Sequence, residues 1–473
     1  MKCKSILSLI LAVVLCCLIL CACQPAPEEE VVISKQEINA TNAPEADRVE
    51  GPQKLILKKD SSFTSTDESV TFTWNVDKTI DIPDISTVNI RPHYLTSQEC
   101  QTVVEAVLGD AVVYDLGLTG IREYTKDELQ DIIGLLTQYL DEQKLQQLLG
   151  DMADYNGLKN ALDEANRQYE QAPAEMPYPT CSWDLTGEHG FDPDVVLRAT
   201  AKLDGIDYEV SVSQHNDPAY QKSSIGIWLG DGNQNNRIVT DIVRARLCRT
   251  EKPTQAQIDA AAEKTREIVA QLGLGSFEVA ETKVLTVPSG DADSYTILVR
   301  AVPIIGGAPA LGQQWSLAYK NSDQFVYNYG LLDAHFTFNA EGQLIGGYIG
   351  DFIEATSTDD KKVSILPADA VIERAQKQLE LYDAESLQTF DMLIMGISAE
   401  GLDCRTSIED IEFGMGRIKA PDDPYGYMYV PAFSFKGRVE FFSNESGEFV
   451  SGDDATELNT LFTINAIDGT VIG

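Results

Sequence analysis

The residues with the greatest capacity for chemistry in this chain are nine cysteines, four histidines and 74 acidic residues. Thiols and imidazoles act as nucleophiles, bases and metal ligands, and carboxylates act as general acids and bases. The pair Glu188–His189 lacks the second histidine that a zinc-binding helix needs. There is no G-x-S-x-G elbow and no P-loop in the sequence. The histidines are isolated from one another, so the chain is not predicted to be an enzyme; they are His93, His189, His215 and His335.

Two weaker patterns leave alternatives open. A glycosidase needs two carboxylates roughly 5–10 Å apart, and acids are abundant enough to supply such a pair. An extracellular hydrolase of wall polymer or peptide is therefore the alternative to a binding function. In "DGNQNN", Asp231, Asn233 and Asn235 alternate like the start of a calcium loop. Asn236 and Ile242 stand where such a loop requires glycine and glutamate, so we predict a plain turn, with no metal and no cofactor.

Four cysteines lie in the body of the chain, far apart and without a C-x-x-C pair, so the spacing of a zinc site is absent. An even number in an exported protein permits two disulfides. Cys100, however, falls on the apolar side of a predicted helix, which favours buried thiols over bridges. The sequence leaves this choice open for Cys100, Cys181, Cys248 and Cys404.

The N-terminus is typical of an export signal. Lys2 and Lys4 precede an apolar run of roughly 17 residues, 6–22, which is at the lower limit for a membrane span. A small residue ends the run, and prolines and glutamates follow instead of a basic stop-transfer cluster. These features predict a cleaved signal peptide over residues 1–22. An ordinary cleavage site nearby, or an uncleaved anchor, is the other interpretation.

The stretch Leu20-Cys21-Ala22-Cys23 resembles the lipobox of bacterial lipoproteins. Leu20 matches the aliphatic position, Ala22 the small residue before the cut, and Cys23 the cysteine that receives a diacylglyceryl group. The resemblance implies lipid attachment at Cys23, which would become the first residue of the mature chain. Two acyl chains suffice for stable anchoring, since each buried methylene contributes about 0.8 kcal/mol. The expected location is the cell membrane, with the protein lipid-anchored on the extracytoplasmic side.

The net charge of the chain is strongly negative, which predicts repulsion between the folded part of the protein and polyanions. The formal net charge is −38, and cleavage removes two lysines and no acids, so the mature value is −38 − 2 = −40. Such a body repels nucleic acid and anionic lipid head groups. We therefore expect no nucleic acid partner.

Length and periodicity predict an α+β fold with two or more domains, in which helices pack on antiparallel sheets. The proline-rich acidic stretch 23–54 is predicted to be a disordered linker. An N-terminal α+β domain with a helical hairpin is expected over 55–250, and a C-terminal α+β domain over 251–473. In the latter, helix, strands, helix and strands follow one another as two units.

Local signals define several elements. Val70, Phe72, Trp74 and Val76 alternate as in a strand. Capping boxes begin helices at Thr96 with Glu99, at Thr125 with Glu128 and at Thr254 with Gln257. The second of these helices is expected to run to Gly150, followed by a third over 158–169, and a fifth begins at Pro367. The stretch "NRIVTDIVRARL" (236–247) is predicted to be a strand.

An internal repeat is suggested by "FTFNAEGQLIGG" (336–347) and "FTINAIDGTVIG" (462–473), each with an acidic-glycine turn. These units resemble the PepSY-type domain of secreted bacterial proteins, in which a helix packs on antiparallel strands. The whole chain resembles an uncharacterised group of Firmicutes lipoproteins known only as a domain of unknown function. That resemblance rests on the lipobox, "TIDIPD" (79–84), "LTSQECQTVVEAVLGD" (95–110) and the C-terminal "TINAIDGTVIG". It implies no catalytic residue.

Aromatic residues alternate in "PYGYMYVPAFSF" (424–435), and Phe325, Tyr327 and Tyr329 do the same. An exposed ladder could stack on glycan or peptide, but sheet packing is the favoured interpretation. The ladder residues are Tyr425, Tyr427, Tyr429, Phe433 and Phe435.

Altogether the sequence predicts a non-catalytic binding, sensing or accessory lipoprotein at the cell envelope. Its possible partners are an envelope protein, a peptide or a glycan.

Overall fold

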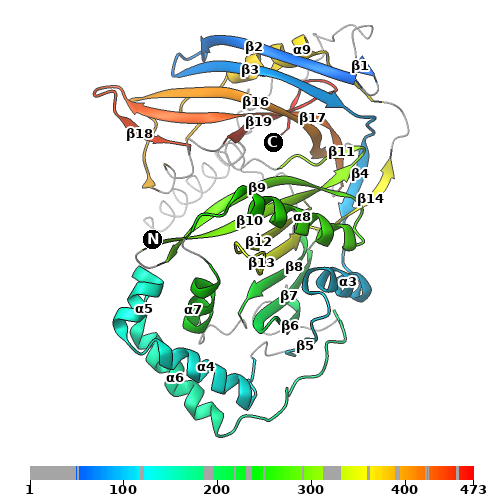
Figure 1. Cartoon of the computed structure of the whole chain (residues 1–473). Coiled ribbons are helices and arrows are strands. Elements are labelled where there is room, and N and C mark those ends of the chain that lie inside the picture. The colour runs from blue at the N-terminus through cyan, green and yellow to red at the C-terminus, as the bar shows by residue number, and fades with distance from the viewer. Residues whose placement is uncertain are drawn as a thin grey trace, which may run out of the picture.

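The fold, seen in a computed structural model, combines helices with two large and mainly antiparallel sheets (Figure 1). It confirms the predicted α+β class, with sheet predominating. The structure describes residues 49–50, 53–117, 122–185, 195–217, 220–230, 237–248, 251–289, 292–312, 332–358, 363–388, 392, 395–420, 423, 426–453 and 458–472. The helices of this part are α3 (Ser97–Leu108), α4 (Lys126–Gln138), α5 (Glu142–Leu149), α6 (Tyr155–Tyr169), α7 (Arg237–Leu247), α8 (Gln255–Gln271) and α9 (Ala368–Leu379). A single 3₁₀ turn, η2 (Gly150–Met152), follows α5.

The first sheet has the order β11-β10-β12-β13-β8-β7-β6-β5, and β9 also pairs with β10. All of these pairings, within the described residues, are antiparallel. The strands are β5 (Val113–Asp115), β6 (Val195–Leu203), β7 (Ile206–Asp217), β8 (Tyr220–Leu229), β9 (Phe277–Ser289), β10 (Ala292–Ile305), β11 (Ala308–Pro309), β12 (Asp333–Phe338) and β13 (Leu344–Gly350).

The second sheet has the order β14-β4-β17-β16-β3-β2, with β18 and β19 on β17 and β20 on β19. Its β16 runs parallel to β3, which joins the C-terminal strands to the N-terminal ones. The strands are β2 (Gln53–Thr64), β3 (Val70–Ile82), β4 (Val88–Pro92), β14 (Ile353–Thr358), β16 (Leu402–Lys419), β17 (Tyr427–Ser443), β18 (Phe449–Gly452), β19 (Asn459–Asn465) and β20 (Val471–Ile472). A separate two-stranded pair joins β1 (Val49–Glu50) to β15 (Ser364–Ile365).

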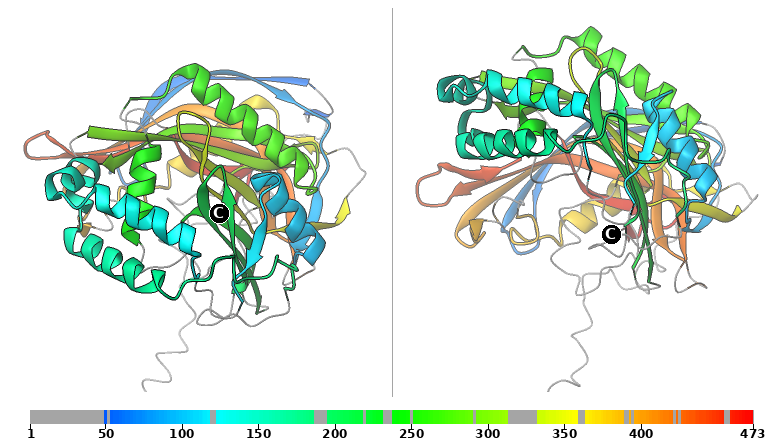
Figure 2. Two further views of the ribbon diagram at one scale, coloured as in Figure 1. Left: turned by 60° about the horizontal axis from the view of Figure 1, so that its bottom comes forward. Right: turned by 90° about the horizontal axis from the view of Figure 1, so that it is seen from below.

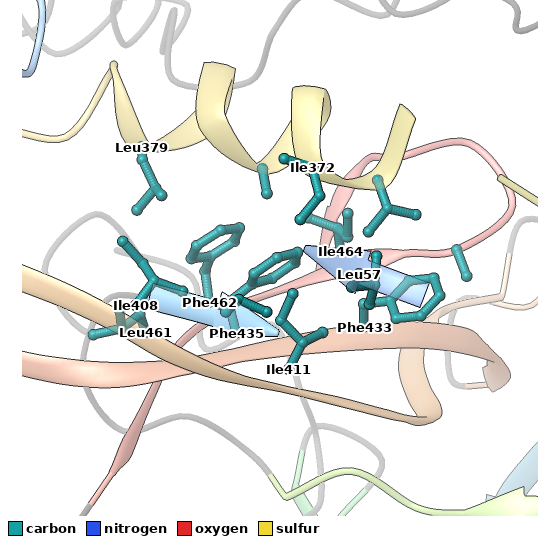
Figure 3. Packing of buried hydrophobic residues seen from close by; sticks show 14 of the residues in the cluster. Leu57, Ile372, Leu379, Ile408, Ile411, Phe433, Phe435, Leu461, Phe462 and Ile464 are labelled. Atoms are coloured by element: carbon teal, nitrogen blue, oxygen red, sulfur yellow. The ribbon is translucent and has the colours of Figure 1, made fainter. Parts of the chain in front are cut away.

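Helix α9 covers the second sheet, and Figure 3 shows its Ile372 and Leu379 above the aromatic residues of β17 and β19. The rings of Phe435 and Phe462 stack with centroids 4.7 Å apart, and Trp74 meets Phe435 edge-on. The described members of the predicted aromatic ladder belong to this core, so the expectation of sheet packing is confirmed; they are Tyr427, Tyr429, Phe433 and Phe435. Tyr425, Phe325, Tyr327 and Tyr329 lie outside the described residues.

Helices α3 and α8 cover one face of the first sheet and share its core. The capping boxes predicted at Thr96, Thr125 and Thr254 all form, because each uses only side chains and N–H groups of one helical turn. Helices α4 to α7 form a smaller cluster at the end of the molecule away from the second sheet (Figure 1). The two views in Figure 2 show this cluster beside the first sheet.

Two predicted elements need correction. Residues 237–247, expected to form a strand, are helix α7. Its Ile238 and Ile242 are four residues apart, and both are buried against α4–α6, so the helical period overrides the β-branched composition. The helix expected to run from 126 to Gly150 is divided into α4 and α5. Asp141 divides it, because its carboxylate accepts hydrogen bonds from the N–H groups of Gln143 and Lys144 and begins a new helix.

The predicted division after residue 250 does not follow the sheets. It falls between β8 and β9, which belong to the same first sheet, and the second sheet combines β2–β4 with β14 and β16–β20. Each core therefore draws residues from both predicted domains. The predicted linker also ends too late, because residues 49–50 pair with β15 and β2 begins at Gln53. Strand pairing joins residues far apart in sequence, so local composition does not reveal it.

The two sheets meet at the β10–β11 turn. Gly306 and Gly307 both have positive φ there, and the Ser86 N–H donates to the Gly306 carbonyl at 2.9 Å. A Cβ on Gly307 would overlap the Asp84 carbonyl oxygen. Leu311 N–H then donates to the Met415 carbonyl on β16 at 2.9 Å. Backbone thus packs directly on backbone at this junction, which requires glycine.

The four described cysteines, Cys100, Cys181, Cys248 and Cys404, are free and buried, as the helical position of Cys100 predicts.

We expect these thiols to resist alkylation by iodoacetamide at pH 8 in the folded protein. Burial raises the pKa of the Cys100 and Cys404 thiols to about 12 and that of Cys181 to about 11, so the reactive thiolate is scarce. Mass spectrometry should find alkylation after unfolding in urea but not before. Native-state modification of Cys404 at the rate of an exposed cysteine would contradict the burial.

Candidate functional site

The candidate site lies on the face of the first sheet opposite α3 and α8. Strand alternation sends Val299, Phe336 and Ile349 into the core and their neighbours to this outer face. Register aligns Arg300 with His335 and His335 with Tyr348 across β10, β12 and β13. Tyr348 in turn faces Gly226 on β8, two residues from Trp228. We call the resulting surface the platform; it consists of Trp228, Tyr348, His335, Arg300 and Asp333.

Trp228 lies flat on the sheet because glycines replace the side chains beneath it. A Cβ at Gly226 would come within 2.5 Å of the indole Nε1, and one at Gly346 within 3.0 Å of Cε3. Tyr348 occupies the space over Gly350 in the same way. Trp228 nonetheless keeps 46% of its surface exposed, in a chain whose other described tryptophans, Trp74 and Trp183, are buried. The indole is therefore held in place and presented to solvent.

A compact polar group borders the aromatic rings. Asp333 Oδ2 lies 2.7 Å from His335 Nε2 and 3.3 Å from Arg300 Nε. The His335 ring meets the Tyr348 ring edge-on, with centroids 6.5 Å apart. The three polar side chains are only partly exposed, between 19% and 37%. Asp333 therefore aligns both neighbours, and the Arg300 guanidinium lies close to Gly312, where an added Cβ would come within 2.8 Å of it.

A second acid–base pair continues the polar surface beyond the tryptophan. Glu209 on β7 stands opposite Trp228, and Arg198 is on the adjacent β6. Burial raises the pKa of the Glu209 carboxyl, and the positive charge of Arg198 acts in the opposite direction. Two arginines thus match two carboxylates around the platform. This surface is close to neutral, although the chain as a whole has a formal charge of −38.

A groove of about 650 Å³ lies separately at the sheet junction. Its apolar part includes Ile82, Pro83 and Phe413, and the ion pair between Lys54 and Asp81 at 3.4 Å is on its rim. Both side chains of that pair are largely exposed, so the pair contributes little to the stability of the fold. Gln53 and Glu278 add polar side chains to the lining of the groove, but no hydrogen bond or ion pair besides Lys54–Asp81 joins its described side chains.

The residues singled out from sequence are dispersed. Cys23, His189, Asp231, Asn233 and Asn235 lie outside the described residues. His93 directly follows β4 and lies between Glu99 and Glu354, His215 lies on β7, and only His335 belongs to the platform. No group of three potential metal ligands occurs in the part of the chain that the structure describes.

Trp228 and Tyr348 were not predicted from the sequence to belong to a site. A signal was present, because "IGIWLG" (225–230) and "LIGGYIG" (344–350) place an aromatic residue two positions from a glycine inside a strand. Glycine in a strand interior marks a place where another group approaches the backbone closely. Here that group is the aromatic ring itself.

Among the described helices, none has the length and apolar character to cross a membrane.

No family model matches the sequence, and no curated protein matches it. Among solved structures, the chain is similar to an uncharacterized protein from Eubacterium rectale ATCC 33656. The match has 9% sequence identity and a TM-score of 0.31, over 88% of this chain and 94% of that one. A likeness of this size carries no argument about function, so the resemblance to Firmicutes lipoproteins stays a prediction.

Proposed function

We propose that this protein is an extracytoplasmic lipoprotein, anchored to the cell membrane by a diacylglyceryl group on Cys23, which binds a ligand of the cell envelope without transforming it. The observation that carries the binding function is the half-exposed Trp228 ring, held over Gly226 and Gly346 on the same sheet face as the Asp333–Arg300 pair. A rigid exposed aromatic ring next to aligned polar groups is typical of a recognition surface. The lipobox supports the location.

We also infer that the C-terminal half repeats one helix-plus-strands unit. In the first unit α8 precedes β9, β10, β12 and β13, and in the second α9 precedes β16, β17, β19 and β20, each set pairing in that order. Five buried positions of α8, and a sixth just after it, recur in and just after α9 at a constant separation of 110 residues (371 − 261 = 110). They are Ala261/Val371, Ala262/Ile372, Thr265/Ala375, Ile268/Gln378, Val269/Leu379 and Leu272/Tyr382.

The turns of the two units support the same inference. Lys264 of α8 donates to the Gly342 carbonyl in the turn after β12. Arg374, which occupies the corresponding position of α9, packs on Gly469 in the turn after β19. Asn339 and Asn465 both accept hydrogen bonds from backbone N–H groups within their turns. The corresponding residues make corresponding contacts, as expected from a PepSY-like unit present twice.

Binding to isolated cell envelopes tests the proposed function. Purified protein that begins at residue 24, and therefore lacks the lipid anchor, should sediment with envelope material, and Trp228→Ala in the same form should reduce the bound fraction about tenfold, since removing a central aromatic contact costs on the order of 1.4 kcal/mol or more. Phe449→Ala is the matched control, because Phe449 is a similarly exposed aromatic residue on the second sheet. Release of soluble wall fragments during the assay would instead favour the hydrolase alternative. Equal binding by both variants would contradict a role for the platform.

A further inference from the structure

We infer that the platform recognises a neutral pyranose glycan, an inference that rests on the binding function proposed above. Three features of the described residues lead to this ligand class. They are the position of the platform within the sheet, the flat presentation of its rings, and its balanced charge. The position also argues against an extended peptide, and the charge argues against an acidic glycan.

The position of the platform argues against an extended peptide. Peptides are commonly captured as an additional strand on a free sheet edge. Trp228, Tyr348 and His335 lie on β8, β13 and β12, each of which is paired on both sides. The backbone hydrogen bonds of these strands are therefore already made within the sheet. A ligand here must bind through side chains alone, as a ring lying on the surface does.

The flat rings suit one face of a pyranose. An aromatic face carries partial negative charge, and the axial C–H groups of a sugar ring form a flat apolar patch with partial positive charge. The glycine floor keeps the indole parallel to the sheet, since any Cβ at Gly226 or Gly346 would push it away. Tyr348 continues the surface over Gly350. The two rings together offer an extended surface to consecutive sugar units.

The polar border suits hydroxyl groups. A carboxylate accepts and a guanidinium donates, so the Asp333–Arg300 pair can bind two adjacent hydroxyls of opposite hydrogen-bonding role. Arg300 is paired with Asp333, and Arg198 acts on Glu209, so neither guanidinium is an isolated positive charge for an anionic sugar. The large negative charge of the chain also disfavours polyanions. These charges select a neutral glycan over an acidic one.

The test is a titration of full-length protein with a panel of neutral hexasaccharides built from glucose, mannose or N-acetylglucosamine, followed by tryptophan fluorescence. An acidic uronate hexasaccharide and a wall stem peptide form the other arms. We expect at least one neutral hexasaccharide to perturb the emission, with affinity about tenfold weaker or worse in Trp228→Ala, because a stacked ring is lost. Binding by that variant is measured calorimetrically.

Gly226→Ala is the second variant, because it displaces the indole while retaining it. It should weaken binding by a similar factor with an unchanged urea midpoint, since the clash involves only a side chain. Phe449→Ala should bind as the original protein does. Binding of the uronate or the stem peptide, with none of the neutral panel, would overturn the glycan inference but leave the proposed function intact. Loss of all envelope binding in the sedimentation assay would overturn both.

Discussion

Replacing Gly307 with alanine is expected to lower the free energy of unfolding by about 3–5 kcal/mol, the range of the most damaging single substitutions. The added Cβ would overlap the Asp84 carbonyl oxygen, and the glycine has a φ of +97°. The backbone cannot move aside, because the neighbouring Gly306 carbonyl accepts from Ser86 N–H and β11 pairs with β10. Equilibrium urea denaturation, followed by circular dichroism, measures the change.

Gly275→Ala is the matched control for this substitution. Gly275 has a φ of +94°, nearly that of Gly307, but a Cβ there would have nothing within 4 Å. The free energy of unfolding of Gly275→Ala should therefore fall by only about 1–2 kcal/mol, the cost of placing a non-glycine residue in the left-handed region. The difference between the two variants isolates the contact between the sheets. Equal losses in both would mean that the close approach at the junction contributes nothing to stability.

Replacing Cys23 with alanine is expected to abolish lipid attachment completely. The Cys23 sulfur is the only atom of that residue that can form the thioether to the diacylglyceryl group. Stable anchoring needs the two acyl chains of that group. Cells grown with labelled palmitate should incorporate label into the original protein and not into the variant. Mass spectrometry should find a lipid-modified Cys23 as the first residue of the mature chain.

Cys21→Ala controls for this experiment, because Cys21 lies two residues away and is predicted to leave with the signal peptide. It should be labelled as strongly as the original protein. A mature chain that begins elsewhere, or an unmodified Cys23 sulfur, would remove the basis for the predicted location. The platform proposal would then need a different compartment.

Helix starts were predictable because the relevant interactions are local. Thr96 and Glu99 bond to each other's backbone within one turn, and the same is true at Thr254 and Gln257. Buried faces followed from the same short-range periodicity, as in β3, where alternate residues from Val70 to Val76 are buried. Helix α7 was mispredicted because β-branched residues favour strands in isolation, whereas here burial of Ile238 and Ile242 decides the conformation.

Most helix starts, the α+β class and the packing of the aromatic residues of 427–435 inside the fold could be predicted from the sequence. These properties depend on neighbours within a few positions. Long-range strand pairing, which the sequence does not reveal, gives both sheets strands from both halves of the chain. The same pairing places Trp228, Tyr348, His335 and Arg300 on one surface. Those residues span more than a hundred positions, and hydrogen bonds between strands, which no local pattern specifies, bring them together.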